Sequence, residues 1–204
     1  MRGHFAESEA MRRAIVAGDL GGLHDAARSL ASDEWTPNLR ADWRPHIAAV
    51  RAAAQSAHTA LSLEEGAAAL GQLGQTCATC HQSTGGPRIP SPSPSLDVAR
   101  DRGMAAHDSA TGKLWAGLVA PSDATWIEGS RQMLAAPELD SDVADISALS
   151  RRVRDLARRG EVAEAPSRAR LFGEVLLTCA SCHQRVGVGT PRSRNETTEP
   201  GKSP

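Results

Sequence analysis

The sequence predicts an all-α protein built from two tandem four-helix bundles, and three observations lead to this. The 204 residues are rich in Ala and Arg and almost lack runs of β-branched residues, which favours helix over strand. A unit of about 85 residues occurs twice, as an internal repeat. Each copy contains four segments with helical periodicity or helix-end signals, joined by short turns, which is the pattern of an antiparallel bundle.

The duplication is visible where each copy begins. Met1 and His4 align with Met104 and His107 at an offset of 103 residues (104 − 1), and the cysteines align at 102 (179 − 77). The same alignment pairs Met11 with Leu114, Ile15 with Leu118 and Asp19 with Ser122. We therefore divide the chain into a first bundle over residues 1–86, a Pro/Ser-rich linker over 87–94, a second bundle over 95–186 and a disordered tail over 187–204.

Helix signals place four helices in each copy. In the first copy we expect helices over 1–17 and 19–32, a third from Pro45 to about Ala60, and a fourth from the capping box at Ser62 through Cys77. In the second copy we expect helices over 95–119, 122–135, 140–159 (closed by Gly160) and 167–184. A buried stripe on the first helix contains His4, Ser8, Met11 and Ile15.

All four cysteines lie in two C-x-x-C-H strings, Cys77 to His81 and Cys179 to His183. Two thiols at i and i+3 share one helix face, where they can bond the two vinyl groups of a porphyrin while the next His offers its imidazole to the iron. A zinc ribbon usually spaces its pairs about 15–20 residues apart, against about a hundred here, and a thioredoxin-like redox site needs a βαβ setting that is missing. The motifs predict two covalent haem c groups, held by Cys77, Cys80, Cys179 and Cys182, with His81 and His183 as proximal iron ligands.

Four helices of which the last ends in C-x-x-C-H resemble the cytochrome c prime family, over nearly residues 1–186. The resemblance implies a haem wedged in each bundle with one face toward the first helix. Two features depart from the family. Family members often carry an aromatic and a basic residue shortly after the proximal His, an arrangement that the residues after His81 and His183 lack. Many members also have an apolar side chain on the distal face, whereas this chain offers ligands there.

His4 and His107 are the expected distal ligands, because they match in the repeat and lie on the buried stripe of each first helix. Met1 and Met104, three residues earlier on the same face, are the alternatives, and would otherwise pack beside the porphyrin. We favour His because His107 is expected about twelve residues into its helix, whereas Met104 follows the helix-weakening Gly103.

Two axial ligands let haem iron change charge without changing ligands, which favours a one-electron carrier. The alternative function is a haem-based module that binds or senses CO or NO at an open distal site. We expect no enzyme and no catalytic residue, because a peroxidase needs an open iron with acid and base groups beside it, and no such pair accompanies either motif.

Charge and hydropathy limit the partners. With 23 basic against 24 acidic residues and a net charge of −1, the chain lacks the basic excess that nucleic-acid binding needs. No apolar run approaches the roughly 20 residues that cross a bilayer. We expect redox proteins as partners, a membrane redox complex included. Since bacteria attach haem c outside the cytoplasmic membrane, we expect a periplasmic or otherwise exported protein, cut from a longer precursor that carried the signal segment.

Overall fold

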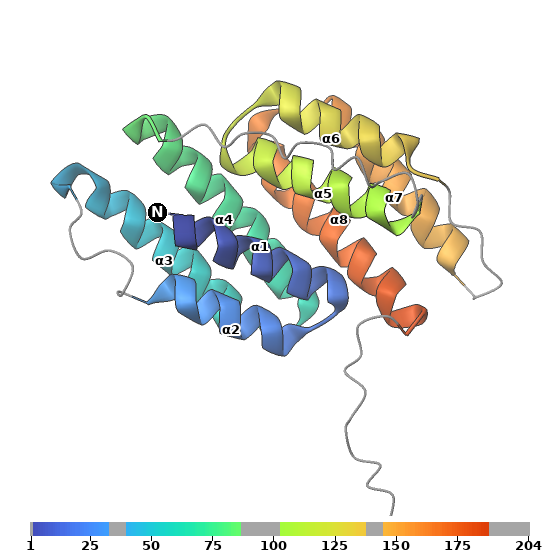
Figure 1. Cartoon of the computed structure of the whole chain (residues 1–204), viewed down its shortest axis with the longest axis horizontal. Helices are drawn as coiled ribbons and strands as arrows, with labels where there is room; N and C mark the ends of the chain where they lie inside the picture. The colour runs from blue at the N-terminus through green and yellow to red at the C-terminus, as the bar shows by residue number, and fades with distance from the viewer. Residues whose placement is uncertain (1, 33–39, 87–102, 138–144, 188–204) are drawn as a thin grey trace, which may run out of the picture.

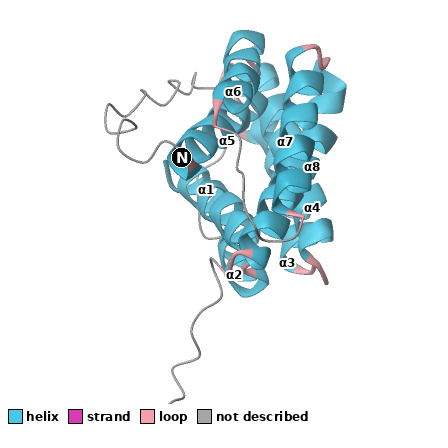
Figure 2. Ribbon diagram, turned by 90° about the vertical axis from the view of Figure 1, so that its right-hand side faces the viewer, coloured by secondary structure: helices cyan, strands magenta, loops and turns pink. Residues whose placement is uncertain are grey.

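The computed structural model describes residues 2–32, 40–86, 103–137 and 145–187. Within these ranges the regular structure is all helical, as expected (Figure 2). The expected linker over 87–94 and all of the expected tail except Gly187 lie outside the described residues. The elements in chain order are α1 (Arg2–Ala17), α2 (Leu20–Ala31), a 3-10 turn η1 (Ala41–Trp43), α3 (Arg44–His58), α4 (Leu63–Thr84), α5 (Met104–Val119), α6 (Asp123–Ala135), α7 (Ile146–Glu161) and α8 (Ala165–Arg185).

Side-chain caps explain where several helices begin. Asp19 caps α2 by accepting from the backbone N–H of Gly22 at 2.8 Å, and its repeat partner Ser122 caps α6 by accepting from the N–H of Thr125 at 3.2 Å. Ser62 caps α4 through the N–H of Glu65. Each cap satisfies a backbone donor that has no partner inside its own helix. The predicted capping residue Ser62 therefore acts as a cap, and the repeat partners Asp19 and Ser122 cap equivalent helices in the two copies.

Three predicted helix boundaries are wrong. The helix expected from residue 140 begins at Ile146, with Asp145 outside it at the N-cap. Gly103 lies outside the helix at the N-cap of α5, which begins at Met104, so His107 lies in the first turn rather than about twelve residues in. Gly160 does not close α7 but is buried within it. A Cβ at Gly160 would lie 2.5 Å from Oγ of Ser130 on α6, so this position needs a residue without a side chain. The Gly160 carbonyl also accepts from Nε1 of the buried Trp126 at 2.8 Å. Gly160 thus serves helix packing rather than helix termination.

The first four helices lie beside the last four, with α4 packed along α8 (Figure 1). Glycines permit this contact. A Cβ on Gly71 of α4 would lie 2.2 Å from the carbonyl oxygen of Ala169, and a Cβ on Gly173 of α8 would lie 2.9 Å from the carbonyl oxygen of Ala67. Gly71 and Ala67 are the repeat partners of Gly173 and Ala169, so the two contacts are related by the duplication. Only residues without a side chain allow two helix backbones to approach this closely.

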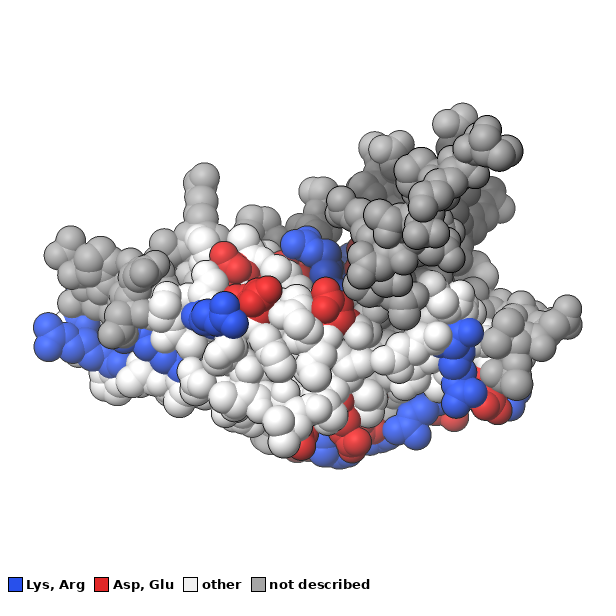
Figure 3. Space-filling view, turned by 90° about the horizontal axis from the view of Figure 1, so that it is seen from below, with Lys and Arg blue, Asp and Glu red and all other residues white. Residues whose placement is uncertain are grey.

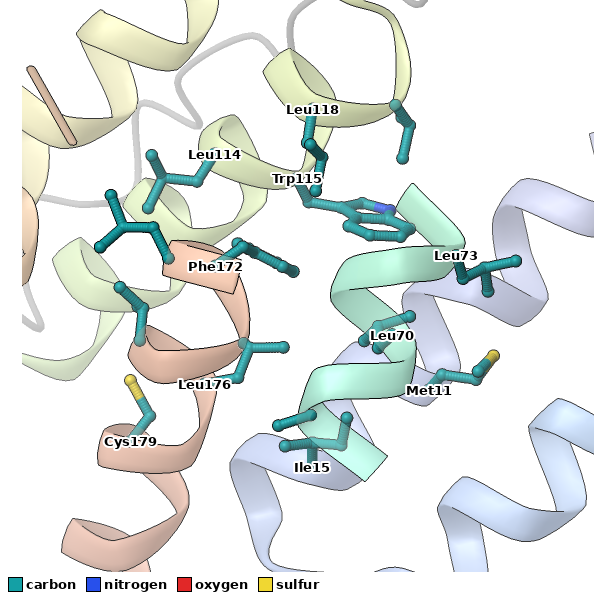
Figure 4. Close-up of a cluster of buried hydrophobic side chains, with 14 of the residues drawn as sticks. Met11, Ile15, Leu70, Leu73, Leu114, Trp115, Leu118, Phe172, Leu176 and Cys179 are labelled. Atoms are coloured by element: carbon teal, nitrogen blue, oxygen red, sulfur yellow. The ribbon is translucent and has the colours of Figure 1, made fainter. Parts of the chain in front are cut away.

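A continuous buried cluster joins the two halves (Figure 4). Met11 and Leu70 from the first half contribute to it together with Trp115 and Phe172 from the second, whose rings stack with centroids 5.4 Å apart. We expected each half to be an autonomous bundle with its own core, completed by its haem. The shared cluster contradicts separate cores, because the contact between α4 and α8 buries apolar side chains of both halves against one another.

None of the described helices is long and apolar enough to cross a membrane. On the face drawn in Figure 3, basic and acidic side chains occur in small mixed groups separated by uncharged surface.

Candidate functional site

The two C-x-x-C-H strings lie in the last turns of α4 and α8, as the sequence predicts. All four cysteines are free thiols. Burial, with a smaller contribution from the neighbouring cysteine of each pair, raises the pKa of Cys77 and of Cys179 to about 12. Thiols with a pKa of about 12 are protonated at neutral pH and are weak nucleophiles in disulfide exchange.

The described residues contain no group of three or more His, Cys, Asp or Glu side chains that could hold a metal ion. A structural zinc site normally needs four such ligands. A haem iron differs, because the porphyrin supplies four nitrogens and the protein adds only one or two axial ligands. An iron held at either motif would need only one further axial ligand beside the histidine of that motif.

At the second motif, a small cavity brings the expected residues together. Cys179, Cys182 and His183 of α8 line it, and so do His107 and Met104 of α5. Part of α7 forms the remaining wall. The donor set suits a haem, but the cavity measures only about 30 Å³, so a porphyrin between His107 and His183 requires α5 and α7 to move away from α8.

Local hydrogen bonding fixes which nitrogen of His107 can bind iron. Nδ1 of His107 lies 2.9 Å from the carbonyl oxygen of Gly103. A carbonyl can only accept, so Nδ1 carries the proton and Nε2 keeps its lone pair. Metal-bound histidines usually have their other nitrogen anchored in this way. Met104 is 45% exposed at the start of the same helix. His107 stays the expected ligand and Met104 the alternative, but the position of the two residues in the helix no longer supports that order.

At the first motif, the charge of the expected proximal histidine acts on the expected distal histidine. His4 of α1 is half-buried, and its pKa is lowered by burial and by the nearby charge of His81 on α4. Nδ1 of His81 donates to the carbonyl oxygen of Val119 at 2.7 Å, which again leaves Nε2 for a metal. The methionine alternative at this site, Met1, lies outside the described residues.

Val119 also belongs to the first site, although no pattern in the sequence indicated it. Val119 ends α5 in the second half, yet its carbonyl orients the histidine of the first motif. A backbone carbonyl carries no sequence signal, and the contact exists only because α5 packs against α4. The first motif is therefore completed partly by the other half of the chain.

Two histidines without a counterpart in the repeat serve the fold. Nε2 of His24 lies 2.9 Å from the carbonyl oxygen of Ala60, and Nδ1 of His58 lies 3.0 Å from that of His24. Their rings meet edge to face at 5.9 Å. These contacts tie α2 to α3 and to the turn before α4, away from both cysteine motifs.

Comparison with known proteins adds no identification, because no protein-family model, no curated protein and no solved structure matches this chain.

Proposed function

We propose that this protein is a di-haem c-type cytochrome that carries single electrons between redox partners outside the cytoplasm. In this proposal the helices form two bundles of the cytochrome c prime type, joined by a shared core. Each bundle holds one covalently attached haem c, through Cys77 and Cys80 on α4 and through Cys179 and Cys182 on α8. Bound haem would supply a one-electron couple at its iron.

The observation that carries the proposal is the pairing of histidines at both motifs. His183 and His107 line the same small cavity, and the charge of His81 acts on the pKa of His4. In His81 and in His107, Nδ1 donates a hydrogen bond to a backbone carbonyl, so Nε2 of each imidazole is left to bind a metal. One motif with a facing histidine could arise by chance. Two motifs with facing histidines at equivalent places favour bis-histidine ligation in both halves.

The chain's own residues perform three tasks in this function. The two cysteines of each motif fix the porphyrin to α4 or α8, so its orientation follows that helix. The histidines hold the same coordination in both oxidation states, which keeps the rearrangement on electron transfer small. The buried apolar cluster, with Leu70, Phe172 and Leu176, excludes water between the two sites.

An optical spectrum with carbon monoxide tests the proposal. The purified protein should be low-spin in both oxidation states and should bind little carbon monoxide. His107→Ala should leave one haem high-spin and able to bind carbon monoxide while the other keeps its spectrum. His46→Ala is the matched control, because His46 is a half-buried histidine outside both sites, and it should leave the spectrum unchanged.

Two results would count against the proposal. Ready carbon monoxide binding at both haems of the unmodified protein means open distal sites, and the gas-binding function then replaces electron transfer. A sulfur-to-iron absorption band in the near infrared means that Met1 and Met104 are the ligands, in which case electron transfer stands and the histidine assignment is wrong.

A further inference from the structure

The outward face of α7 is strongly basic. Its solvent-exposed residues recur at helical spacing, and four of them are arginines: Arg151, Arg152, Arg158 and Arg159. Asp155 is the only acidic residue among the exposed residues of α7, so four positive charges against one negative give this face a net formal charge of +3. At a rise of 1.5 Å per residue, the row is about 12 Å long. We call these five residues the α7 stripe.

Two arginines of the α7 stripe are not neutralised by any described side chain. Arg158 pairs with Asp155 at 2.6 Å, and Arg159 pairs with Glu174 of α8 at 3.2 Å. Arg151 and Arg152 are exposed and form no ion pair within the described part of the chain. A guanidinium group in this state suits two-pronged hydrogen bonding to a carboxylate of another molecule.

The duplication shows that a helix of this kind does not need these charges in order to fold. With the offset of 103, α7 corresponds to α3, and the buried positions of the two helices agree, as in Val50 with Val153 and Ala54 with Ala157. The positions of the α7 stripe are also exposed in α3, where they hold uncharged residues: Ala48, Ala49, Ala52, Gln55 and Ser56. The charge of the stripe therefore distinguishes the second half from the first.

The α7 stripe and the second motif lie on opposite sides of one helix. The inward face of α7 contributes Leu149, Ser150 and Val153 to the cavity that His183 and both cysteines of its motif line. A molecule docked on the outward face therefore approaches the second site to within about one helix diameter, roughly 10 Å. Because the stripe belongs to the outer face of α7, it moves together with that helix when the cavity widens.

We propose that the α7 stripe is the docking surface for an acidic redox protein, which exchanges electrons with this chain through the second haem. This inference rests on the proposed function and adds the chemistry of the partner. A basic surface favours an acidic occupant because complementary charge speeds the encounter and orients the two proteins. A single electron passes between the partner and the second haem, and no bond forms or breaks. The first half has no such stripe on α3, so it lacks this route.

Binding of an acidic peptide tests the surface. The probe is a fluorescein-labelled oligoglutamate peptide, and its anisotropy is followed with the full chain. Arg151→Glu combined with Arg152→Glu should weaken binding by about tenfold at low salt, and the difference should shrink at high salt because exposed charges are screened. The control combines Arg13→Glu with Arg44→Glu, which makes the same change in net charge at two exposed arginines of α1 and α3. It should change binding by less than about twofold.

Electron exchange with an anionic oxidant tests the link to the second haem. Oxidation of the reduced protein by ferricyanide, followed by stopped-flow absorption, should show one phase for each haem. In the double variant of α7, one phase should slow by about tenfold at low salt while the other keeps its rate. The slowed phase is assigned to the second haem if His107→Ala alters the same phase.

Weakened peptide binding together with one slowed phase at the second haem supports the proposal. It is overturned if the α7 and control variants bind the peptide equally well, if both phases slow alike, or if the slowed phase belongs to the first haem. It is also overturned if phosphatidylglycerol vesicles bind the stripe more tightly than the peptide does, because the occupant is then a membrane. These results leave the proposed function intact, since haem is present in each. A chain that binds the peptide but carries no haem overturns the proposed function and the electron exchange with it.

Discussion

The close approach of α4 and α8 leads to a sharp prediction for Gly71→Ala. An added Cβ would lie 2.2 Å from the carbonyl oxygen of Ala169, so the two helices must open by about 1 Å to restore ordinary contact. Overpacking of this kind costs about 1–3 kcal/mol. The gain in helix propensity on replacing Gly by Ala offsets at most about 1 kcal/mol of that. We expect a net loss of about 1–2 kcal/mol in the free energy of unfolding.

Gly112→Ala is the matched control. Gly112 also lies inside a helix, α5, and a Cβ there would meet nothing within 4 Å. Propensity alone then applies, and this variant should gain up to about 1 kcal/mol. In a chain of this size 1 kcal/mol shifts the melting temperature by about 2–4 °C. Thermal unfolding followed by circular dichroism should therefore move the two midpoints in opposite directions.

The result that refutes this reasoning is a Gly71→Ala protein at least as stable as the Gly112→Ala protein. The two halves would then not be in contact through α4 and α8, and the shared core would be wrong. Gly173→Ala gives an intermediate test, because its clearance of 2.9 Å from the Ala67 carbonyl oxygen demands a smaller adjustment.

Three further outcomes follow from single contacts. Trp126→Phe should destabilise the protein by about 1–3 kcal/mol, because it removes the hydrogen bond to the Gly160 carbonyl and leaves a cavity where the fully buried indole packs; an unchanged urea midpoint contradicts this. Ser62→Ala should lower the free energy of unfolding by about 1 kcal/mol through the lost cap of α4. A loss below about 0.3 kcal/mol, which is close to the error of such measurements, would show that the cap is dispensable. A third outcome concerns the protein produced without haem attachment. Unfolded thiols ionise above a pKa of 9.0, whereas the folded protein holds the pKa of Cys77 and Cys179 at about 12, so the free energy of unfolding should fall as the pH rises from 9 to 12. Urea titrations over this pH range measure the fall, and a flat profile contradicts the burial of these thiols.

Local signals predicted the helices well. Asp19, Ser62 and Ser122 begin helices because a short polar side chain satisfies backbone donors within its own turn, so no knowledge of distant residues is needed. The repeat partners Ile15 and Leu118 are both buried, as their helical phase predicts. Gly160 was misread because the same residue type suits both a helix end and a close helix contact.

Contacts between the halves could not be predicted in the same way. Which face of one amphipathic unit meets another depends on residues about a hundred positions apart. One signal was present: Ala67 and Gly71 recur as Ala169 and Gly173, which is the small-x-x-x-small spacing of closely packed helices. Arg12 was a second, because its helical phase places a charge on the buried stripe of α1, where it forms an ion pair with α5. The carbonyl of Val119, in contrast, could be found only in three dimensions.

The histidine pairs were predicted from the repeat. The structure places His107 in the cavity of the second motif, and the charge of His81 acts on the pKa of His4. The choice of His over Met rested on an expected helix extension before Met104, and Gly103 at the N-cap removes that support. What remains in favour of histidine is the hydrogen bond from Nδ1 of His107 to Gly103, a feature of the folded chain.

The central claim, that each cysteine motif carries a covalent haem, is tested most directly by the intact mass of the denatured protein. The sample should come from a bacterial host that exports the chain and attaches haem c. The account predicts the polypeptide mass plus two haem masses, reduced to one by the double change Cys179→Ser and Cys182→Ser. A bare polypeptide, a single added haem in the unmodified chain, or bound zinc in place of haem would contradict it.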